Sequence, residues 1–356
     1  MVPAESTGQH KDRVLPGAPS RPGAASPLLD IKNLTIEFGS FNPPARAIEG
    51  VCLTVHHGET VCLVGESGSG KSVTALSIAR LLSSPPARYV EGEIWLDGHE
   101  ILGLPETELR RLRGRVVSYV FQEPSASLNP VRTIGSQILE ALKLHQPSLA
   151  TKEEVVRLLA MVGIPSPETR ADDYPHQMSG GMQQRAAIAM AIASRPKLLV
   201  ADEPTTALDV TVQAQILDLM RELQGEFGMA ILLITHNLGI VREIANRVAV
   251  IYAGQIVETA PCAELLRQPR HPYTAALIRA VPELGRRANR LHAIPGQVPS
   301  SFDRPEGCRF HPRCEFARPE CQKNSPLLIP AGLGHWTRCP WHDQLPLAPL
   351  SPDSKA

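Results

Sequence analysis

The chain has 356 residues, 43% of them apolar, so it is long enough for one large domain and a smaller one around a sizeable core. Lysine plus arginine and aspartate plus glutamate both number 36, and this neutral balance argues against a general nucleic-acid binder. No apolar run approaches the roughly 18 residues of a membrane-spanning helix, and the N-terminus lacks the apolar core of a secretion signal. We therefore expect a cytoplasmic chain that has no nucleic acid as a partner and reaches a membrane only through another protein.

The N-terminal third predicts a tail followed by strands. Residues 1–27 hold five prolines, three glycines and few large apolar side chains, which is typical of a disordered tail. Alternating or apolar runs then predict strands at 28–38, 51–55, 59–64, 92–96 and 116–121. A glycine loop follows the third run, and helical spacing predicts a helix over 71–82. Strand, glycine loop and helix in this order are the context that a phosphate-binding loop requires.

The pattern becomes helical between about residues 128 and 180, with helical spacing at 134–144 and 152–161, which indicates an inserted helical subdomain. A helix over 181–193 follows. Apolar strands at 198–201, 230–235 and 247–252 then alternate with helices at 210–227 and 238–246. This alternation predicts a mainly parallel sheet. Ala253-Gly254 predicts a hairpin turn into a strand over 255–259, and the chain beyond residue 260 is rich in proline, arginine and cysteine.

The glycine loop fits the pattern G-x-x-x-x-G-K-[ST] fully. It consists of Gly65, Glu66, Ser67, Gly68, Ser69, Gly70, Lys71 and Ser72. Its glycines let successive backbone N–H groups point into one concavity that holds the phosphates of ATP. We expect Lys71 to reach the β- and γ-phosphates and the Ser72 hydroxyl to hold Mg²⁺. A chance glycine turn is the alternative, which the flanking strand and helix disfavour.

An acid pair, Asp202-Glu203, ends the apolar strand at 198–201. A buried strand can end in acids simply because the chain emerges into water. Together with the phosphate loop, the pair predicts hydrolysis: Asp202 supports the Mg²⁺ shell and Glu203 polarises the attacking water.

Three further features have ordinary alternatives when each is taken alone. Ser179, Gly180 and Gly181 open a helix and offer an anion site, although a plain N-cap serine would look the same. Gln122 and His236 each follow a strand, where a lone glutamine is usually surface and a lone histidine usually structural. The order of all these motifs along the chain favours a functional role for each.

In this order the motifs of residues 28–260 resemble those of ABC transporter nucleotide-binding domains. The resemblance implies an α/β fold: a P-loop NTPase with a RecA-like core, antiparallel β-strands and an inserted α-helical subdomain. It implies that Gln122 contacts the metal and the water, and that His236 contacts the γ-phosphate. It places Asp209 in the loop that crosses a dimer interface. It implies that Phe38, or else Phe41, stacks on adenine. It also implies that four residues contact the ATP of a partner subunit: Ser179, Gly180, Gly181 and Met182.

A narrower resemblance covers residues 28–342. His271-Pro272-Tyr273-Thr274, the late cysteines and Met182 are similar to the ATPase subunits of oligopeptide and dipeptide importers. This similarity implies peptide uptake, a second, homologous but different ATPase subunit, two permease subunits, a solute-binding protein and a place at the cytoplasmic face of the membrane. Nickel or another solute is an alternative cargo. A soluble ABC ATPase is a further alternative, but it typically has coiled-coil insertions or two cassettes; the intact catalytic set argues against a non-enzymatic module.

Four cysteines lie in the expected C-terminal extension, residues 261–342, which precedes a flexible tail over 343–356. They are Cys308, Cys314, Cys321 and Cys339, and four thiolates can hold zinc or an iron–sulfur cluster. The absence of a C-x2–4-C pair favours the cluster, and the resemblance to peptide importers implies a [4Fe–4S] cluster. Zinc, free thiols and disulfides are the alternatives.

Overall fold

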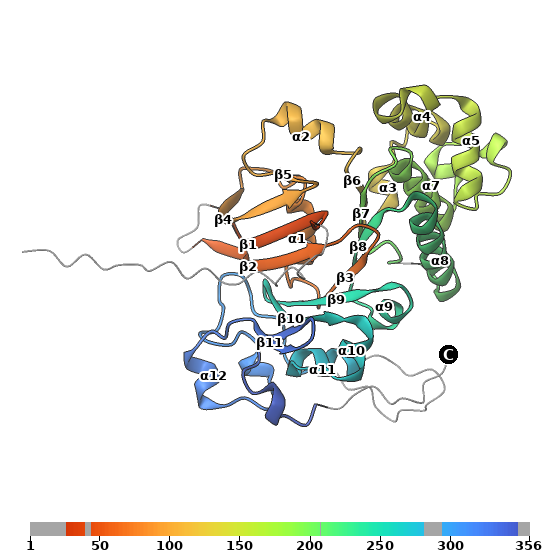
Figure 1. The fold of residues 1–356 in the computed structure, drawn as a ribbon. Helices are drawn as coiled ribbons and strands as arrows, with labels where there is room; N and C mark the ends of the chain where they lie inside the picture. The colour runs from red at the N-terminus through yellow and green to blue at the C-terminus, as the bar shows by residue number, and fades with distance from the viewer. Residues whose placement is uncertain (1–25, 40–43, 207, 281–293, 348–356) are drawn as a thin grey trace, which may run out of the picture.

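The computed structural model describes residues 26–39, 44–206, 208–280 and 294–347, and Figure 1 shows their arrangement. Most of the two expected tails, 1–27 and 343–356, lies outside these residues. Within the described part the strands form two sheets. The smaller, antiparallel sheet has the order β2 (Ala45–Val55), β1 (Leu29–Phe38), β4 (Ala87–Leu96), β5 (His99–Glu100). The larger sheet has the order β11 (Ile329–Gly332), β12 (His335–Thr337), β10 (Gln255–Pro261), β9 (Arg247–Tyr252), β3 (Thr60–Val64), β8 (Ala230–Thr235), β7 (Leu198–Asp202), β6 (Val117–Val120).

The parallel core predicted from the alternation of strands and helices is confirmed. Strands β9, β3, β8, β7 and β6 are parallel neighbours. Parallel strands are normally covered on both faces, and β3 is buried along its whole length. Val61 and Leu63 pack with the antiparallel sheet, whereas Cys62 and Val64 pack with the helices on the other face. The strand that leads into the glycine loop is therefore fixed from both sides.

Helices lie in the segment where the sequence predicts an inserted helical subdomain, and Figure 1 shows α4 and α5 projecting beyond the β6 edge of the sheet. Thr133 and Thr151 begin these two helices, because each hydroxyl accepts a hydrogen bond from a first-turn N–H group. The subdomain consists of α3 (Pro124–Ser127), α4 (Ile134–His145), η1 (Pro147–Leu149), α5 (Lys152–Met161), α6 (Pro167–Arg170), η2 (Pro175–Gln177) and α7 (Gly180–Ile192).

The remaining helices of the ATPase-like part are α1 (Lys71–Ser77), α2 (Glu106–Leu112), α8 (Val210–Phe227) and α9 (Leu238–Ile244). The predicted helix 71–82 is too long, since α1 ends at Ser77 and Arg80 adopts a left-handed φ of 50°. The predicted turn at Ala253-Gly254 is confirmed, with φ of 46° and 81° at these two residues. None of the helices in the described residues is long and apolar enough to cross a membrane.

The C-terminal elements continue the large sheet. Strand β12 pairs antiparallel with β10, so that Glu258 lies opposite Thr337 and Thr259 opposite Trp336. Neither β11 nor β12 was predicted, because both strands are short and follow a segment rich in proline and cysteine. The accompanying helices are α10 (Cys262–Arg267), α11 (Pro272–Arg279), η3 (His311–Arg313), α12 (Pro319–Lys323) and η4 (His342–Gln344).

A buried carboxylate joins these elements to the core. Glu258 on β10 is 0% exposed. It accepts hydrogen bonds from the backbone N–H groups of Arg270 and His271, at 2.6 and 2.9 Å, and contacts the His335 Nε2 atom at 2.7 Å. The start of α11 and the strand β12 thus converge on one side chain.

We predict that Glu258→Ala lowers the free energy of unfolding by about 3 kcal/mol, because it leaves two buried N–H groups and a buried histidine without their acceptor. Denaturant titration of the full chain measures this loss. Glu264→Ala is the control, since this exposed carboxylate pairs only with Arg267 and should change stability by less than about 1 kcal/mol. Equal stability of the two variants would contradict the prediction.

Candidate functional site

The glycine loop lies between β3 and α1 and lines a pocket of about 1150 Å³. Gly68 and Gly70 have φ of 76° and 105°, values that side chains rarely tolerate. A Cβ atom on Gly65 would lie 2.3 Å from the Ile251 carbonyl oxygen. The turn at Gly254 supports the loop from behind, because its N–H group donates to the Ser69 carbonyl at 2.8 Å. The loop therefore keeps its cradle shape only with this pattern of glycines.

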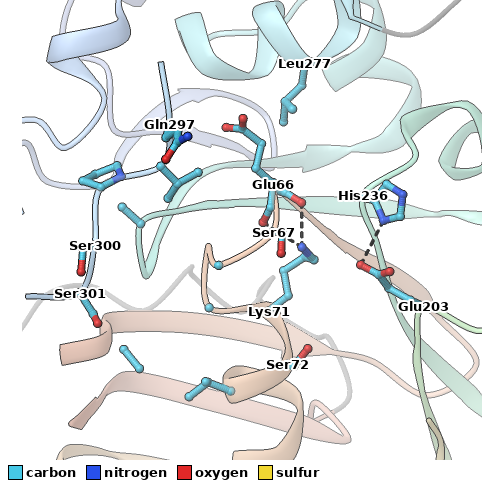
Figure 2. Close-up of a pocket in the computed structure, with 18 of the residues that line it drawn as sticks. Glu66, Ser67, Lys71, Ser72, Glu203, His236, Leu277, Gln297, Ser300 and Ser301 are labelled. Atoms are coloured by element: carbon cyan, nitrogen blue, oxygen red, sulfur yellow. Dashed lines mark hydrogen bonds and ion pairs between the residues drawn. The ribbon is translucent and has the colours of Figure 1, made fainter. Parts of the chain in front are cut away.

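Lys71 lies at the centre of the pocket and is folded onto the loop. Its Nζ atom donates to the carbonyl oxygens of Gly65 and Glu66, at 2.8 and 2.9 Å (Figure 2). Burial lowers the pKa of Lys71, while the nearby carboxylates of Glu203 and Asp202 act in the opposite direction. A phosphate in the pocket would offer this ammonium group a stronger acceptor than the two carbonyls.

Two buried oxygen atoms beside the pocket lack a hydrogen-bond partner in the described structure, and the one on Asp202 supports a cation site next to Ser72. Within the described residues, Ser69 Oγ and Asp202 Oδ1 have no hydrogen-bond partner, although both are inaccessible to water. Such groups are costly unless a ligand satisfies them. Burial, and then the neighbouring Glu203 carboxylate, raise the pKa of Asp202 against the opposing hydrogen bond from Ser72. A divalent cation held by Ser72 and Asp202 would reverse this shift and satisfy the free oxygen.

Glu203 stands at the opposite side of the pocket from the C-terminal segment and is held by three side chains. His236 Nδ1 lies 3.1 Å from its Oε1 atom, while Thr206 Oγ1 and Gln122 Nε2 donate to Oε2 at 2.8 and 3.3 Å. The backbone φ of Glu203 is 47°, a strained value for a non-glycine residue. Burial would raise the pKa of Glu203, but the hydrogen bonds from His236 and Thr206 outweigh it and lower the pKa below its usual value.

The structure thus brings together the loop, Gln122, Asp202, Glu203 and His236, as the sequence predicts. Thr206, three residues before Asp209, is a further member of the site, because its position three residues after Glu203 places its hydroxyl on the carboxylate. A carboxylate that is ionised at neutral pH and directed into a phosphate pocket can accept a proton from an attacking water.

The Ser179 segment does not line this pocket. Ser179 caps α7 by accepting a hydrogen bond from the Met182 N–H group at 3.3 Å, and both Ser179 and Gly180 are exposed. A Cβ atom on Gly181 would lie 3.3 Å from Val212 on α8, and the exposed Asp209 caps that helix. These residues therefore present an outward surface that has no role at the chain's own phosphate loop.

Phe38, expected to stack on the base, ends β1 and packs against the core below it; it is not among the residues that line the pocket. The alternative, Phe41, lies outside the described residues. Ala47 on β2 lines the pocket near this position instead.

Residues of the C-terminal segment complete the pocket, and the sequence gives no signal for them. Gly296, Gln297, Val298, Pro299, Ser300, Ser301 and Arg304 line it. Arg313 binds both carboxylate oxygens of Glu66, at 2.7 and 2.9 Å, across 247 positions of sequence. The Tyr273 hydroxyl accepts a hydrogen bond from the Glu66 N–H group at 2.9 Å.

The predicted iron–sulfur or zinc site is wrong. Cys308, Cys314, Cys321 and Cys339 line one cavity of about 320 Å³. Within the described residues, however, no three histidine, cysteine or acidic side chains come together in a way that could hold a metal ion. The cavity also contains Phe310 and Trp341, and burial raises the pKa of Cys314 to about 11 and of Cys339 to about 12. Burial in the wall of this largely apolar cavity thus disfavours the thiolate form of Cys314 and Cys339 that a metal ligand needs.

The chain matches two family models and many known proteins. Residues 48–206 match the ABC transporter family and residues 257–321 the C-terminal region of oligopeptide/dipeptide transporters. A peptide import ATP-binding protein of Brucella ovis is 51% identical over 326 residues, covering 88% of this chain and 96% of that protein. The dipeptide transport ATP-binding protein DppD of Escherichia coli is 48% identical over 314 residues, with the same coverage of 88% and 96%.

Solved structures agree with this assignment. The ATP-binding cassette MJ0796, in a dimeric post-hydrolysis state with ADP and phosphate, has a TM-score of 0.59 and 28% identity, covering 66% of this chain and 98% of that one. The fold and the site define an ABC-type ATPase. The chain belongs to the ABC transporter family, in the group of ATP-binding subunits that carry the oligopeptide/dipeptide transporter C-terminal region.

We predict that Thr206→Val shifts the acidic limb of the pH profile of ATP hydrolysis to higher pH. Removing the hydroxyl removes one interaction that lowers the pKa of Glu203, so the carboxylate becomes protonated at a higher pH as the solution is acidified. The rate of hydrolysis, measured against pH, tests this. Thr206→Ser keeps the hydroxyl, so its rate should fall at the same acidic pH as that of the wild type. If the rates of all three proteins fall at the same pH, the assignment of Glu203 as the base is contradicted.

Proposed function

We propose that this chain is the ATP-hydrolysing subunit of an ABC importer that takes up oligopeptides or dipeptides through membrane permease subunits. The observation that carries the proposal is the Glu203 carboxylate, held by His236, Thr206 and Gln122 at the end of the pocket that the phosphate loop forms. The import of peptides rests on the similarity to the proteins of Brucella ovis and Escherichia coli.

The roles that we propose for the individual residues draw on this geometry and on the family resemblance. The backbone N–H groups of residues 65–70 bind the phosphates. The Lys71 ammonium exchanges its hydrogen bonds to the Gly65 and Glu66 carbonyls for bonds to the phosphates and so neutralises part of their charge. Ser72, Asp202 and Gln122 hold Mg²⁺, which supplies charge neutralisation on the phosphate oxygens. Glu203 accepts the proton of the attacking water, and His236 orients Glu203 and contacts the γ-phosphate.

A second ATPase subunit, homologous but different, is proposed to complete each site. The exposed Ser179 and Gly180, with Gly181 and Met182 at the start of α7, offer the positive end of a thirteen-residue helix to the partner's ATP. Asp209 lies on the same exposed surface at the start of α8. The stacking of Phe38 on adenine stays a prediction, since Phe38 packs against the core beside the pocket.

The wider assembly is proposed to contain two permease subunits and a solute-binding protein, with this chain at the cytoplasmic face of the membrane. We also propose that residues 28–260 act as the ATPase domain and residues 261–342 as the importer-specific extension. The described C-terminal region, with its hairpin on the edge of the large sheet, supports an extension that is continuous with the ATPase core.

Reconstitution in vesicles tests the proposal as a whole. The complex of this chain, its ATPase partner and the permeases should hydrolyse ATP faster when the solute-binding protein carries a peptide. Stimulation by nickel and not by any peptide would reject the peptide assignment. Hydrolysis that no membrane subunit influences would reject the role in transport.

We predict that Glu203→Gln lowers the turnover of ATP at least about 100-fold and leaves ATP binding intact, because the amide keeps the shape of the side chain but cannot accept the proton. Hydrolysis and equilibrium binding are measured on the same preparation. Lys71→Ala is the matched variant and should lose binding as well. Near-normal hydrolysis by the Glu203→Gln variant would rule out Glu203 as the general base.

A further inference from the structure

The nucleotide pocket has two ends. Figure 2 shows Glu203 and His236 on one side of Lys71, and Gln297, Ser300 and Ser301 on the other. The phosphate that is cleaved must lie on the side of Glu203. The rest of the nucleotide therefore leaves the phosphate loop towards the side that the C-terminal segment occupies.

We propose that residues 296–301, here called the wall segment, recognise the ribose and the base of ATP. The inference rests on the ATP pocket assigned above and deepens it, since it assigns the nucleoside end of the pocket to the C-terminal region. The phosphate loop then binds the triphosphate, and the wall segment distinguishes a nucleotide from a bare polyphosphate.

The wall segment has the mixed chemistry that a nucleoside requires. Val298 and Pro299 offer apolar surface for a flat ring, whereas Gln297, Ser300 and Ser301 offer donors and acceptors for hydroxyl groups and ring edges. In the described part of the chain, the side chains of Gln297 and Ser301 have no hydrogen-bond partner in the protein, so both are available to a ligand. Ser300 accepts one hydrogen bond, from the Phe302 N–H group at 3.2 Å.

Two arginines fix the wall segment at its ends. At the N-terminal end of the segment, Arg313 Nε donates to the Pro295 carbonyl at 2.7 Å, and the same guanidinium donates to the Glu66 carboxylate. After the segment, Arg304 donates to the Ala47 carbonyl on β2 at 3.0 Å. The Arg304 and Arg313 side chains are only 13% and 5% exposed. An exposed segment that is anchored in this way keeps its polar groups directed at the pocket at low entropic cost.

Arg313 is thus a positioning residue that acts on both halves of the pocket. Its bonds to Glu66 set the phosphate loop, and its bond to Pro295 sets the wall segment. A planar guanidinium with five donors can bind a carboxylate through two parallel hydrogen bonds and a carbonyl at the same time, whereas the three donors of a lysine share one nitrogen atom.

The direct test compares the binding of ATP and of inorganic triphosphate to the full chain by calorimetry. The triple variant Gln297→Ala, Ser300→Ala, Ser301→Ala should weaken ATP binding roughly tenfold, the loss expected for a few hydrogen bonds. Its affinity for triphosphate should not change. Unchanged ATP binding, or an equal loss for both ligands, would overturn the proposal.

The control variant is Gln322→Ala, Ser325→Ala, which removes similar side chains from exposed positions of the same region that do not line the pocket. It should bind both ligands as the wild type does, and a loss of ATP binding as large as that of the triple variant would refute the proposal. The wild-type chain separates this inference from the function on which it rests. If the wild type binds no ATP, the assigned pocket itself is wrong; if it binds ATP but the triple variant binds equally well, only the role of the wall segment is wrong.

A second pair of variants tests the role of Arg313. Arg313→Ala releases both Glu66 and Pro295, whereas Glu66→Ala leaves the bond to Pro295 in place. The ratio of ATP affinity to triphosphate affinity should therefore fall in Arg313→Ala and stay constant in Glu66→Ala. An equal fall in both variants would show that only the ion pair matters and would overturn the link between Arg313 and the wall segment.

Discussion

The ion pair between Arg313 and Glu66 is the interaction on which the geometry of the pocket depends. A glycine loop gains its ability to bind phosphate from backbone N–H groups that all point inward, and such a backbone needs support from outside. In this chain the Tyr273 hydroxyl and the Arg313 guanidinium both hold Glu66, one through its backbone and the other through its carboxylate. Arg313 is in turn nearly buried and lies against the Tyr252 ring. The C-terminal region is therefore part of the catalytic pocket and not an appendage to it.

The charged side chains of the pocket suit a phosphate ligand that carries a bound divalent cation. Burial lowers the pKa of Lys71 and raises that of Asp202, so each group favours its neutral form more than it would in water. Glu203 differs because hydrogen bonds from His236 and Thr206 keep it ionised. A phosphate would favour the charged form of the lysine and a divalent cation that of the aspartate, whereas hydrogen bonds within the protein already favour the ionised form of Glu203. Binding energy thus assembles the site, and the hydrolytic group needs no further activation.

Much of the fold and of the phosphate site could be predicted from the sequence, because the signals are local. The glycine loop, the acid pair after β7 and His236 after β8 each stand next to the strand that positions them, and parallel strands end at the same edge of the sheet. The wall segment and Arg313 could not be predicted, since their partners lie more than two hundred residues away and neither has a motif. The cysteine spacing was misleading because spacing alone does not say how four thiols are placed, and in the part of the chain that the structure describes no three of them are placed to hold a metal ion.

Buried arginine side chains attach the C-terminal region to the large sheet and to β2. Arg338 is 8% exposed and donates to the carbonyls of Ile256 on β10 and Pro326, at 2.7 and 2.9 Å. Arg309 reaches the Ala253 carbonyl and the Glu49 carboxylate on β2. Burying a guanidinium is costly unless most of its donors are paired, and a rigid fork of five N–H groups can pair with strand carbonyls that a metal site would leave untouched. In the sequence, the many arginines after residue 260 indicate only a change in composition. The structure shows that several of them bond this region to the ATPase sheet.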